Sequence, residues 1–186
     1  MWNDSKKFIF MHPKKCGGSS IEILLREHFD DNIEPYNSQH FTLSDVSKLI
    51  KNPLDDYFVF GCIRNPWDRM VSLYYHSIKH DKDAIGLTFN EYIRKPGHWM
   101  KYNLSGKNFF VHDGHYRMDA VAKLENFKED MKPIMAKLNI SDYTLPHYNH
   151  GTSRPTIPYQ EYYDLDSRLF IEKMFSWDIE KFQYEF

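Results

Sequence analysis

The stretch KFIFMHPKKCGGSSIEILLREHF, residues 7–29, combines a strand, a glycine loop and a helix. Residues 7–12 are a short, continuous apolar run, which is typical of a strand buried on both faces. After the loop, apolar side chains recur at helical spacing, at Ile21, Leu24, Leu25 and Phe29. Ser19 or Ser20 is available as the N-cap of this helix. A strand, a loop and a helix in this order predict an α/β fold.

Two further strands follow along the chain. Residues 57–63 (YFVFGCI) are a second buried apolar run, and residues 118–124 (MDAVAKL) are a third. Because the strands alternate with helices, we expect a parallel sheet with helical crossovers. No repeat or Pro/Gly-rich linker marks a boundary, so we expect one domain over residues 1–186.

Helix starts can be predicted from capping patterns. They are a capping box of Thr42 with Asp45 before a helix at 43–51, Pro66 in a first turn, Thr88 with Glu91, and Asn126 with Glu129. Ile171, Met174 and Phe175 belong to a closing helix. Residues 96–117 have an irregular pattern, and residues 144–160 are expected to be loop because they contain three prolines and a glycine.

Composition narrows the class of protein. Formal net charge is −2, so nothing global points to nucleic acid or an anionic membrane as a partner. Two cysteines, Cys16 and Cys62, make no disulfide framework, and reduced thiols fit a cytoplasmic protein. No run of 18 apolar residues occurs, so we expect no membrane span.

The glycine loop has the features of a phosphate site. Ligands of a parallel sheet bind at the carboxyl ends of its strands, and residues 12–20 lie at such an end. The two glycines let the backbone approach an anion, Lys15 adds a full charge, and the helix N-terminus adds a partial one. The loop is not a Walker A motif, because that motif places the lysine after the glycines. The sequence also has no Walker-type aspartate after the second strand, so Mg²⁺ is not implied. The alternative interpretation is a glycine-rich turn with a good N-cap.

A second pattern begins where the 57–63 strand ends. Arg64 is expected at the same sheet edge as Lys15, and Ser72 lies about two turns into the next helix, so both can face one groove. Arginine binds oxyanions through a bidentate fork. The alternative is that Arg64 caps neighbouring carbonyl groups. For Asp68 and Arg69 we favour a solvated surface pair.

Together the two segments resemble the sulfotransferases that use 3′-phosphoadenosine 5′-phosphosulfate (PAPS), in particular the branch that contains carbohydrate sulfotransferases. The first family signature, roughly H-x-P-K-x-x-G-[ST]-S-[IL], matches residues 12–21. Lys14 takes the proline position, so the catalytic lysine falls on Lys15, with Lys14 as the alternative. The second signature, R-[ND]-P-[FYW]-x-R-x-[VL]-S, matches residues 64–72 at every position. Weaker similarity follows at 124–127 and in the C-terminal tail.

The resemblance implies a three-layer, P-loop-NTPase-like fold and an enzyme of the EC 2.8.2 type. Such an enzyme transfers a sulfonate group from PAPS to a hydroxyl acceptor, leaves the product PAP, and needs no metal. Lys15 would stabilise the leaving phosphate, Arg64 and Ser72 would bind the 3′-phosphate, and Arg154 in a late basic loop would assist. The cofactor-binding residues implied in this way are Lys15, Cys16, Gly17, Gly18, Ser19, Ser20, Arg64, Ser72 and Arg154.

The acceptor hydroxyl must lose its proton, and histidine is the usual base near neutral pH. His40, between the two cofactor segments, is the candidate, although a loop histidine that caps the next helix is the other interpretation. Three histidines compete for the role: His76, His112 and His115. His147 and His150 could bind a metal, but no third ligand is evident and a loop is favoured.

Two other functions fit part of this pattern. A P-loop-type nucleotide or small-molecule kinase shares the fold, and a catalytically inactive PAP-binding module would keep the nucleotide site alone. The acceptor is expected to be a small or exposed hydroxyl, such as one on a glycan. Four aromatic side chains could stack on sugar or lipid rings or belong to the core: Tyr74, Tyr75, Trp99 and Tyr102.

Overall fold

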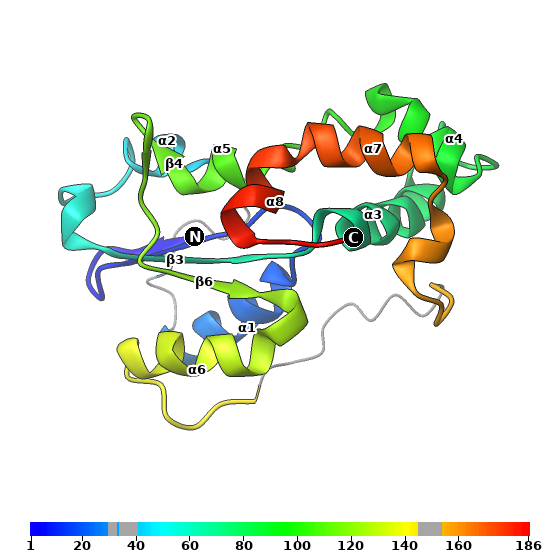
Figure 1. Ribbon diagram of the computed structural model, residues 1–186. Coiled ribbons are helices and arrows are strands. Elements are labelled where there is room, and N and C mark those ends of the chain that lie inside the picture. The colour runs from blue at the N-terminus through cyan, green and yellow to red at the C-terminus, as the bar shows by residue number, and fades with distance from the viewer. Residues whose placement is uncertain (30–32, 34–40, 145–153) are drawn as a thin grey trace. The chain divides into compact units, whose positions relative to one another are not determined.

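The computed structural model describes residues 1–29, 33, 41–144 and 154–186. Figure 1 shows the ribbon of the chain. The chain divides into two compact units. The first unit comprises Met1–Ile63 with Gly106–Tyr148, and the second comprises Arg64–Ser105 with Asn149–Phe186. The expectation of one domain over residues 1–186 stays a prediction.

A four-stranded sheet forms the centre of the first unit. Its strands lie in the order β1 (Trp2–Asn3), β2 (Phe8–Met11), β3 (Phe58–Ile63) and β6 (Ala120–Lys123). β2 pairs with β3 in parallel, and β3 pairs with β6 in parallel. The parallel core of the sheet was predicted and is confirmed. β1, which pairs antiparallel with β2, was not predicted, because two residues are too short for an apolar pattern.

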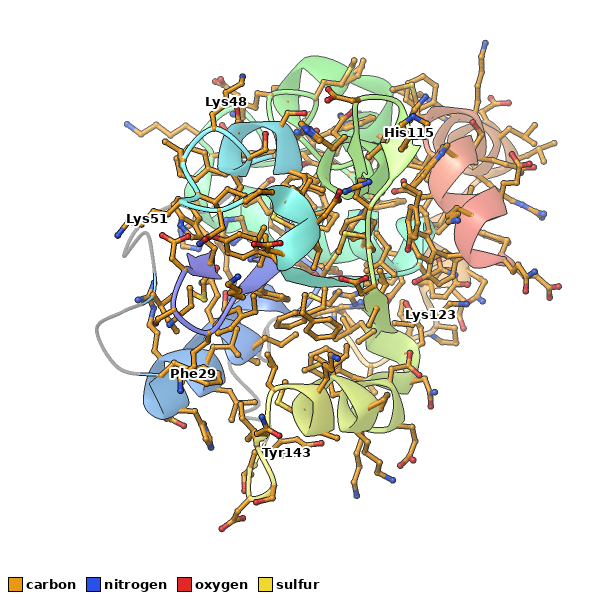
Figure 2. The ribbon with its side chains drawn as sticks, turned by 90° about the vertical axis from the view of Figure 1, so that its left-hand side faces the viewer. Phe29, Lys48, Lys51, His115, Lys123 and Tyr143 are labelled. Carbon is orange, nitrogen blue, oxygen red and sulfur yellow. The ribbon has the colours of Figure 1, made fainter. Side chains whose placement is uncertain are left out.

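Helices cover both faces of this sheet. Alternate residues of β2 and β3, with Phe10 and Phe60 among them, share one buried cluster with α1 (Gly18–Phe29) and α6 (Phe127–Lys137). On the other face, Gly61 approaches Phe110 of α5 (Gly106–Phe110), which packs against α2 (Leu43–Val46). Figure 2 shows Lys48 and Lys51 near α2 on one side of the sheet, and Phe29 and Tyr143 on the other. The predicted central sheet with flanking helices is therefore confirmed.

Capping patterns in the sequence predicted some helix ends correctly and others incorrectly. The capping boxes of Thr42 with Asp45 and of Thr88 with Glu91 are both present. However, α2 ends at Val46 and does not continue to residue 51. The irregular segment 96–117 contains α5 and a hairpin of β4 (Val111–His112) with β5 (His115–Tyr116).

One predicted N-cap is wrong, and another is confirmed in position but not in its side-chain hydrogen bond. α1 already begins at Gly18, so Ser19 and Ser20 lie inside its first turn and cannot cap it. Asn126 does precede α6, but its side chain makes no cap hydrogen bond and donates to the Asp130 carboxylate at 2.7 Å. Sequence offers several polar residues near each helix start, and only the backbone path decides which one takes the cap position.

The second unit is helical. Its helices are α3 (Pro66–His80), α4 (Phe89–Arg94), α7 (Leu165–Met174) and α8 (Ser176–Phe182). α3 packs against α4, α7 and the 3-10 helix Tyr159–Tyr162. Pro66 occupies the first turn of α3, as predicted. None of the helices among the described residues has the length and apolar character needed to cross a membrane.

Arg69 and Asp178 form a buried ion pair in the second unit. Both side chains are 0 % exposed, and Arg69 Nη2 lies 3.1 Å from Asp178 Oδ2. The guanidinium also lies over the Phe175 ring, 4.7 Å from its centroid. The predicted solvated pair of Asp68 with Arg69 is therefore wrong. Successive helical residues point about 100° apart, so Arg69 can face the core while Asp68 faces a different side.

Candidate functional site

The loop between β2 and α1 lies at the carboxyl edge of the parallel strands. Gly17 is close to Leu124, the residue that directly follows β6, because a Cβ at Gly17 would lie 2.8 Å from Leu124 Cδ1. The loop after one strand thus contacts the segment after another. This is the edge at which open α/β sheets bind their ligands.

The loop has a backbone shape that suits an anion. Lys15 and Gly17 both adopt left-handed conformations, with φ of 67° and 82°. Left-handed residues in a short loop turn neighbouring N–H groups to one side and create an anion-binding concavity. For a lysine this conformation costs on the order of 1 kcal/mol or more, and such strain is concentrated at functional sites. α1 follows at once, has no acidic residue in its first turn, and adds the positive end of its dipole.

The His12 side chain packs against Gly18, the first residue of α1. A Cβ at Gly18 would lie 2.2 Å from His12 Nδ1, so only glycine allows this close approach. The ring is stacked on Phe10 at a centroid distance of 5.2 Å, and its Nε2 lies 3.1 Å from Glu22 Oε1. Burial opposes ionisation of Glu22, but the hydrogen bond to His12 together with nearby positive charges, Arg26 among them, outweighs burial and lowers the Glu22 pKa. His12 is thus held as a support for the glycine.

The predicted cofactor contacts in the loop differ in exposure. Cys16 is fully buried in the core, and its Sγ lies 3.8 Å from the Lys14 carbonyl oxygen. Ser20 is 6 % exposed, whereas Lys14, Lys15 and Ser19 are half-buried. Both lysines can therefore reach the surface, and the assignment of catalysis to Lys15 rather than Lys14 stays a prediction.

In the second unit, some residues of segment 64–72 are buried and fix the start of α3, and others are half-buried. Asn65 caps α3, since its Oδ1 accepts from Trp67 N at 3.0 Å, and its Nδ2 donates to the Glu185 carbonyl oxygen at 2.9 Å. Trp67 is 2 % exposed and donates through Nε1 to the Arg168 carbonyl oxygen. These contacts fix the start of the helix.

Arg64, Asp68 and Ser72 are the half-buried residues of this segment. Asp68 and Ser72 lie four residues apart on α3, and Arg64 lies just before the helix begins. Arg64 Nε and Nη2 both lie 2.7 Å from Asp68 Oδ2. Arg154 joins them, with its Nη2 at 2.7 Å from Asp68 Oδ1. Two arginines that the sequence assigned to one phosphate therefore share one carboxylate.

A tyrosine lies near the second arginine. Tyr162 is within electrostatic reach of Arg154, and its hydroxyl oxygen accepts from Tyr75 Oη of α3 at 3.2 Å. Burial raises the pKa of Tyr162 to about 12, so the phenol stays neutral at physiological pH. The cluster thus carries two positive charges and one negative charge at the start of a helix.

The comparison with known proteins decides the family. A model of the sulfotransferase family matches residues 1–185. The chain belongs to the sulfotransferase family. Sulfotransfer is therefore its general activity, and the resemblance seen in segments 12–21 and 64–72 is confirmed.

The fold of this sulfotransferase is similar to that of a solved one. The crystal structure of a sulfotransferase from Alicyclobacillus acidocaldarius has a TM-score of 0.52 and 17 % sequence identity, covering 94 % of this chain and 92 % of that chain. An uncharacterized protein of Archaeoglobus fulgidus is 29 % identical over 98 residues, which are 52 % of this chain and 79 % of that protein.

The expected meeting of Lys15 with Arg64 joins the two units and stays a prediction. His40, the candidate base, and the His147/His150 pair lie outside the described residues. Within the described part of the chain, no three His, Cys, Asp or Glu side chains gather as metal ligands would, and a metal-free site stays a prediction.

The competing histidines are placed apart from the loop or in the other unit. His112 and His115 belong to the hairpin that precedes β6, so they lie toward the amino end of that strand, away from the loop edge. His112 Nδ1 is 3.2 Å from Ser44 Oγ. His76 lies on α3, where its ring packs on His80 at 4.7 Å. The first two placements do not favour a role beside Lys15.

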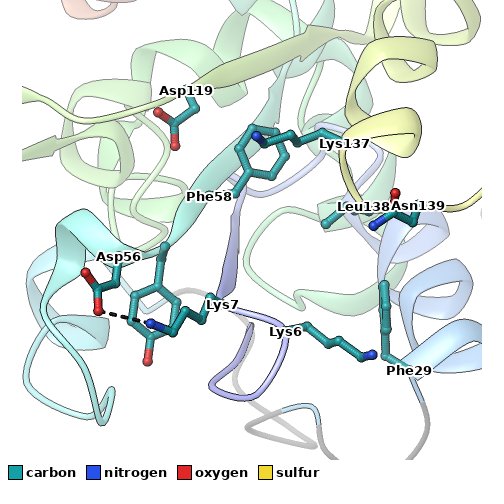
Figure 3. A pocket seen from close by; sticks show the side chains of 10 residues that line it. Lys6, Lys7, Phe29, Asp56, Phe58, Asp119, Lys137, Leu138 and Asn139 are labelled. Carbon is teal, nitrogen blue, oxygen red and sulfur yellow. Dashed lines mark hydrogen bonds and ion pairs between the residues drawn. The ribbon is translucent and has the colours of Figure 1, made fainter.

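A groove of this sulfotransferase lies at the edge of the sheet opposite the glycine loop. It has a volume of about 570 Å³ and lies at the amino ends of the strands. Lys6, Lys7 and Lys137 are among the side chains that line it (Figure 3). Lys7 is paired with Asp56 at 3.1 Å, and Asp119 adds another carboxylate. The last turns of α1 and α6 contribute Phe29 and Lys137 to the lining, and helix C-termini carry partial negative charge. This groove suits a doubly charged nucleotide less well than the loop does.

Sequence reasoning missed the roles of Asp68 and Glu22. Asp68 carried a signal, since Arg64 precedes it by four residues, the spacing of a helical ion pair. Among the aromatic candidates, Trp99 is 1 % exposed and packs on Phe170 and Phe175, so it is core.

Proposed function

We propose that this sulfotransferase moves a sulfonate group from PAPS to a hydroxyl acceptor, with Lys15 stabilising the leaving phosphate. The observation that carries the proposal is the strained loop before α1, where a left-handed lysine and a left-handed glycine precede a twelve-residue helix. A loop of this shape binds a phosphate-like anion without a metal ligand set.

The residues present fit a nucleotide with two separate anionic ends. The loop offers backbone N–H groups, the Lys15 charge and the Ser19 hydroxyl to one anion. In the second unit, the Asp68-linked arginines and Ser72 offer a net positive charge to another. PAPS has two such ends, the 5′-phosphosulfate and the 3′-phosphate, and its sulfonate sits on a phosphate leaving group.

Sulfonate transfer requires the protein to position the donor and the acceptor and to stabilise the charge that develops on the leaving group. A bond forms between the acceptor oxygen and sulfur while the bond from sulfur to the phosphate oxygen breaks, and negative charge grows on that oxygen. Lys15 and the N–H groups of the loop are arranged to stabilise this charge. The acceptor proton passes to a base, for which we propose His40. We propose a small or exposed hydroxyl acceptor, such as one on a glycan.

Calorimetric titration tests the donor. We expect PAP to bind tightly without metal and to bind better than ATP with Mg²⁺. Lys15→Ala should weaken PAP binding, whereas Lys137→Ala, which removes the same charge at the far groove of the same unit, should not. Preference for Mg-ATP, or equal loss in both variants, would contradict the proposal. PAP release from PAPS with a panel of hydroxyl acceptors then distinguishes an enzyme from an inactive nucleotide-binding module.

A further inference from the structure

We propose that Asp68 is a positioning residue that holds Arg64 and Arg154 together as one anion-binding fork. The inference rests on the proposed function, because it concerns the residues assigned there to the 3′-phosphate. It adds a requirement for an acidic side chain within a site meant for an anion.

The geometry divides the carboxylate between the two arginines. Asp68 Oδ2 accepts from Nε and Nη2 of Arg64, each at 2.7 Å, and Oδ1 accepts from Nη2 of Arg154 at 2.7 Å. Each oxygen thus serves a different guanidinium. The three side chains are 14 %, 20 % and 22 % exposed for Arg64, Asp68 and Arg154, so solvent screens these contacts less than on an open surface.

Two neighbouring arginines need a negatively charged partner, which here is the Asp68 carboxylate. Their like charges repel, and Arg154 comes from a segment far along the chain from Arg64. Asp68 offsets one charge and leaves a net charge of +1 for an incoming anion. A guanidinium carries five N–H donors, more than Asp68 engages on either arginine.

The carboxylate itself has a fixed place. Asp68 lies in the first turn of α3, where the helix dipole favours an acidic side chain, and its backbone N–H donates to the cap Asn65. Tyr162 lies near Arg154, and Tyr162 is itself held by the hydrogen bond that its hydroxyl oxygen accepts from Tyr75. The fork is therefore built on one helix start, and Asp68 is its junction.

The decisive variant is Asp68→Asn. An amide has one oxygen, so it can accept from one arginine and turns its NH₂ toward the other. We expect the Kd for PAP to rise about 10-fold, the size of a lost charged hydrogen bond. We also expect KM for PAPS to rise while kcat stays nearly unchanged. Simple electrostatics predicts the opposite sign, because the variant removes a negative charge beside an anion.

Two further variants control this measurement. Asp166→Asn removes an exposed carboxylate from α7 of the same unit and should change the Kd by less than about twofold. Asp68→Glu keeps two oxygens and should recover part of the affinity. Should Asp68→Asn fail to fold, Asp68→Ser carries the same test, because a single hydroxyl oxygen cannot serve both arginines either and the change should also weaken PAP binding.

Titration with inorganic phosphate separates this inference from the proposed function. If wild type binds PAP, and Asp68→Asn (or Asp68→Ser in its place) binds it equally or more tightly, the inference is overturned and the function stands. If wild type binds phosphate but not PAP, and Asp68→Asn weakens phosphate binding, the function fails and the inference stands. If neither ligand binds, both are overturned.

Discussion

Gly18→Ala is the substitution for which the structure gives the sharpest expectation. A Cβ at this position would lie 2.2 Å from His12 Nδ1 and 2.3 Å from two carbons of the ring, which is closer than real Cβ atoms approach. The ring cannot easily give way, because it is stacked on Phe10 and hydrogen-bonded to Glu22. The extra methyl group must therefore displace either the ring or the loop that follows β2.

The magnitude follows from the cost of overpacking, which is about 1–3 kcal/mol in well-packed sites. For a chain of this size, 1 kcal/mol corresponds to roughly 2–4 °C, so a loss of about 2 kcal/mol lowers Tm by about 4–8 °C. A displaced loop also misplaces Lys15, and a misplacement of about 1 Å can cost on the order of 100-fold in rate.

Thermal unfolding followed by circular dichroism measures the first effect, and calorimetric PAP binding measures the loop. Gly97→Ala is the matched control, because a Cβ there meets nothing within 4 Å. The double variant His12→Ala/Gly18→Ala should lose less than the sum of the two single variants, since removing the ring makes room for the methyl group. If Gly18→Ala melts and binds PAP as Gly97→Ala does, the close approach is not real and the reasoning fails.

Three further predictions follow from the same contacts. Lys15→Ala should lower kcat for sulfonate transfer by about 10²–10³, and an unchanged kcat in a PAP-release assay would exclude its proposed role. The lowered Glu22 pKa means that the contact with His12 stabilises the fold above the ordinary carboxyl pKa of 4.5 and is lost as pH falls through the lower folded value. The Tm difference between wild type and Glu22→Gln should therefore be largest near neutral pH and shrink in acid, and a constant difference would count against it. Asp178→Ala should lower the free energy of unfolding in urea by about 3–5 kcal/mol, because it removes the carboxylate that pairs with the buried Arg69 charge, and a loss below about 1 kcal/mol would refute this.

The central strands could be predicted from the sequence because buried parallel strands have a strong local apolar pattern. The runs at 7–12 and 57–63 are apolar on both faces, and the structure has β2 and β3 there. The capping box at Thr88 was equally local, since both of its hydrogen bonds join residues three apart. Features that depend on one side chain and its neighbours in sequence could therefore be predicted.

The failures involve partners far apart in the chain. Arg69 looked like a surface residue because Asp178, its buried partner, is more than a hundred residues away. Asp68 was paired with Arg69 although Arg64, its local partner, precedes it by four residues; only its second partner, Arg154, lies far along the chain. The close fit of His12 under Gly18 is a matter of packing, for which the motif alone gives no distance.

A crystal structure of the protein with PAP tests the central claim most directly. We expect one PAP molecule whose 5′-phosphate contacts Lys15 and the loop N–H groups and whose 3′-phosphate contacts Arg64 and Arg154. PAP bound in the groove between Lys6 and Lys137, or touching only one of the two cationic segments, would contradict the account.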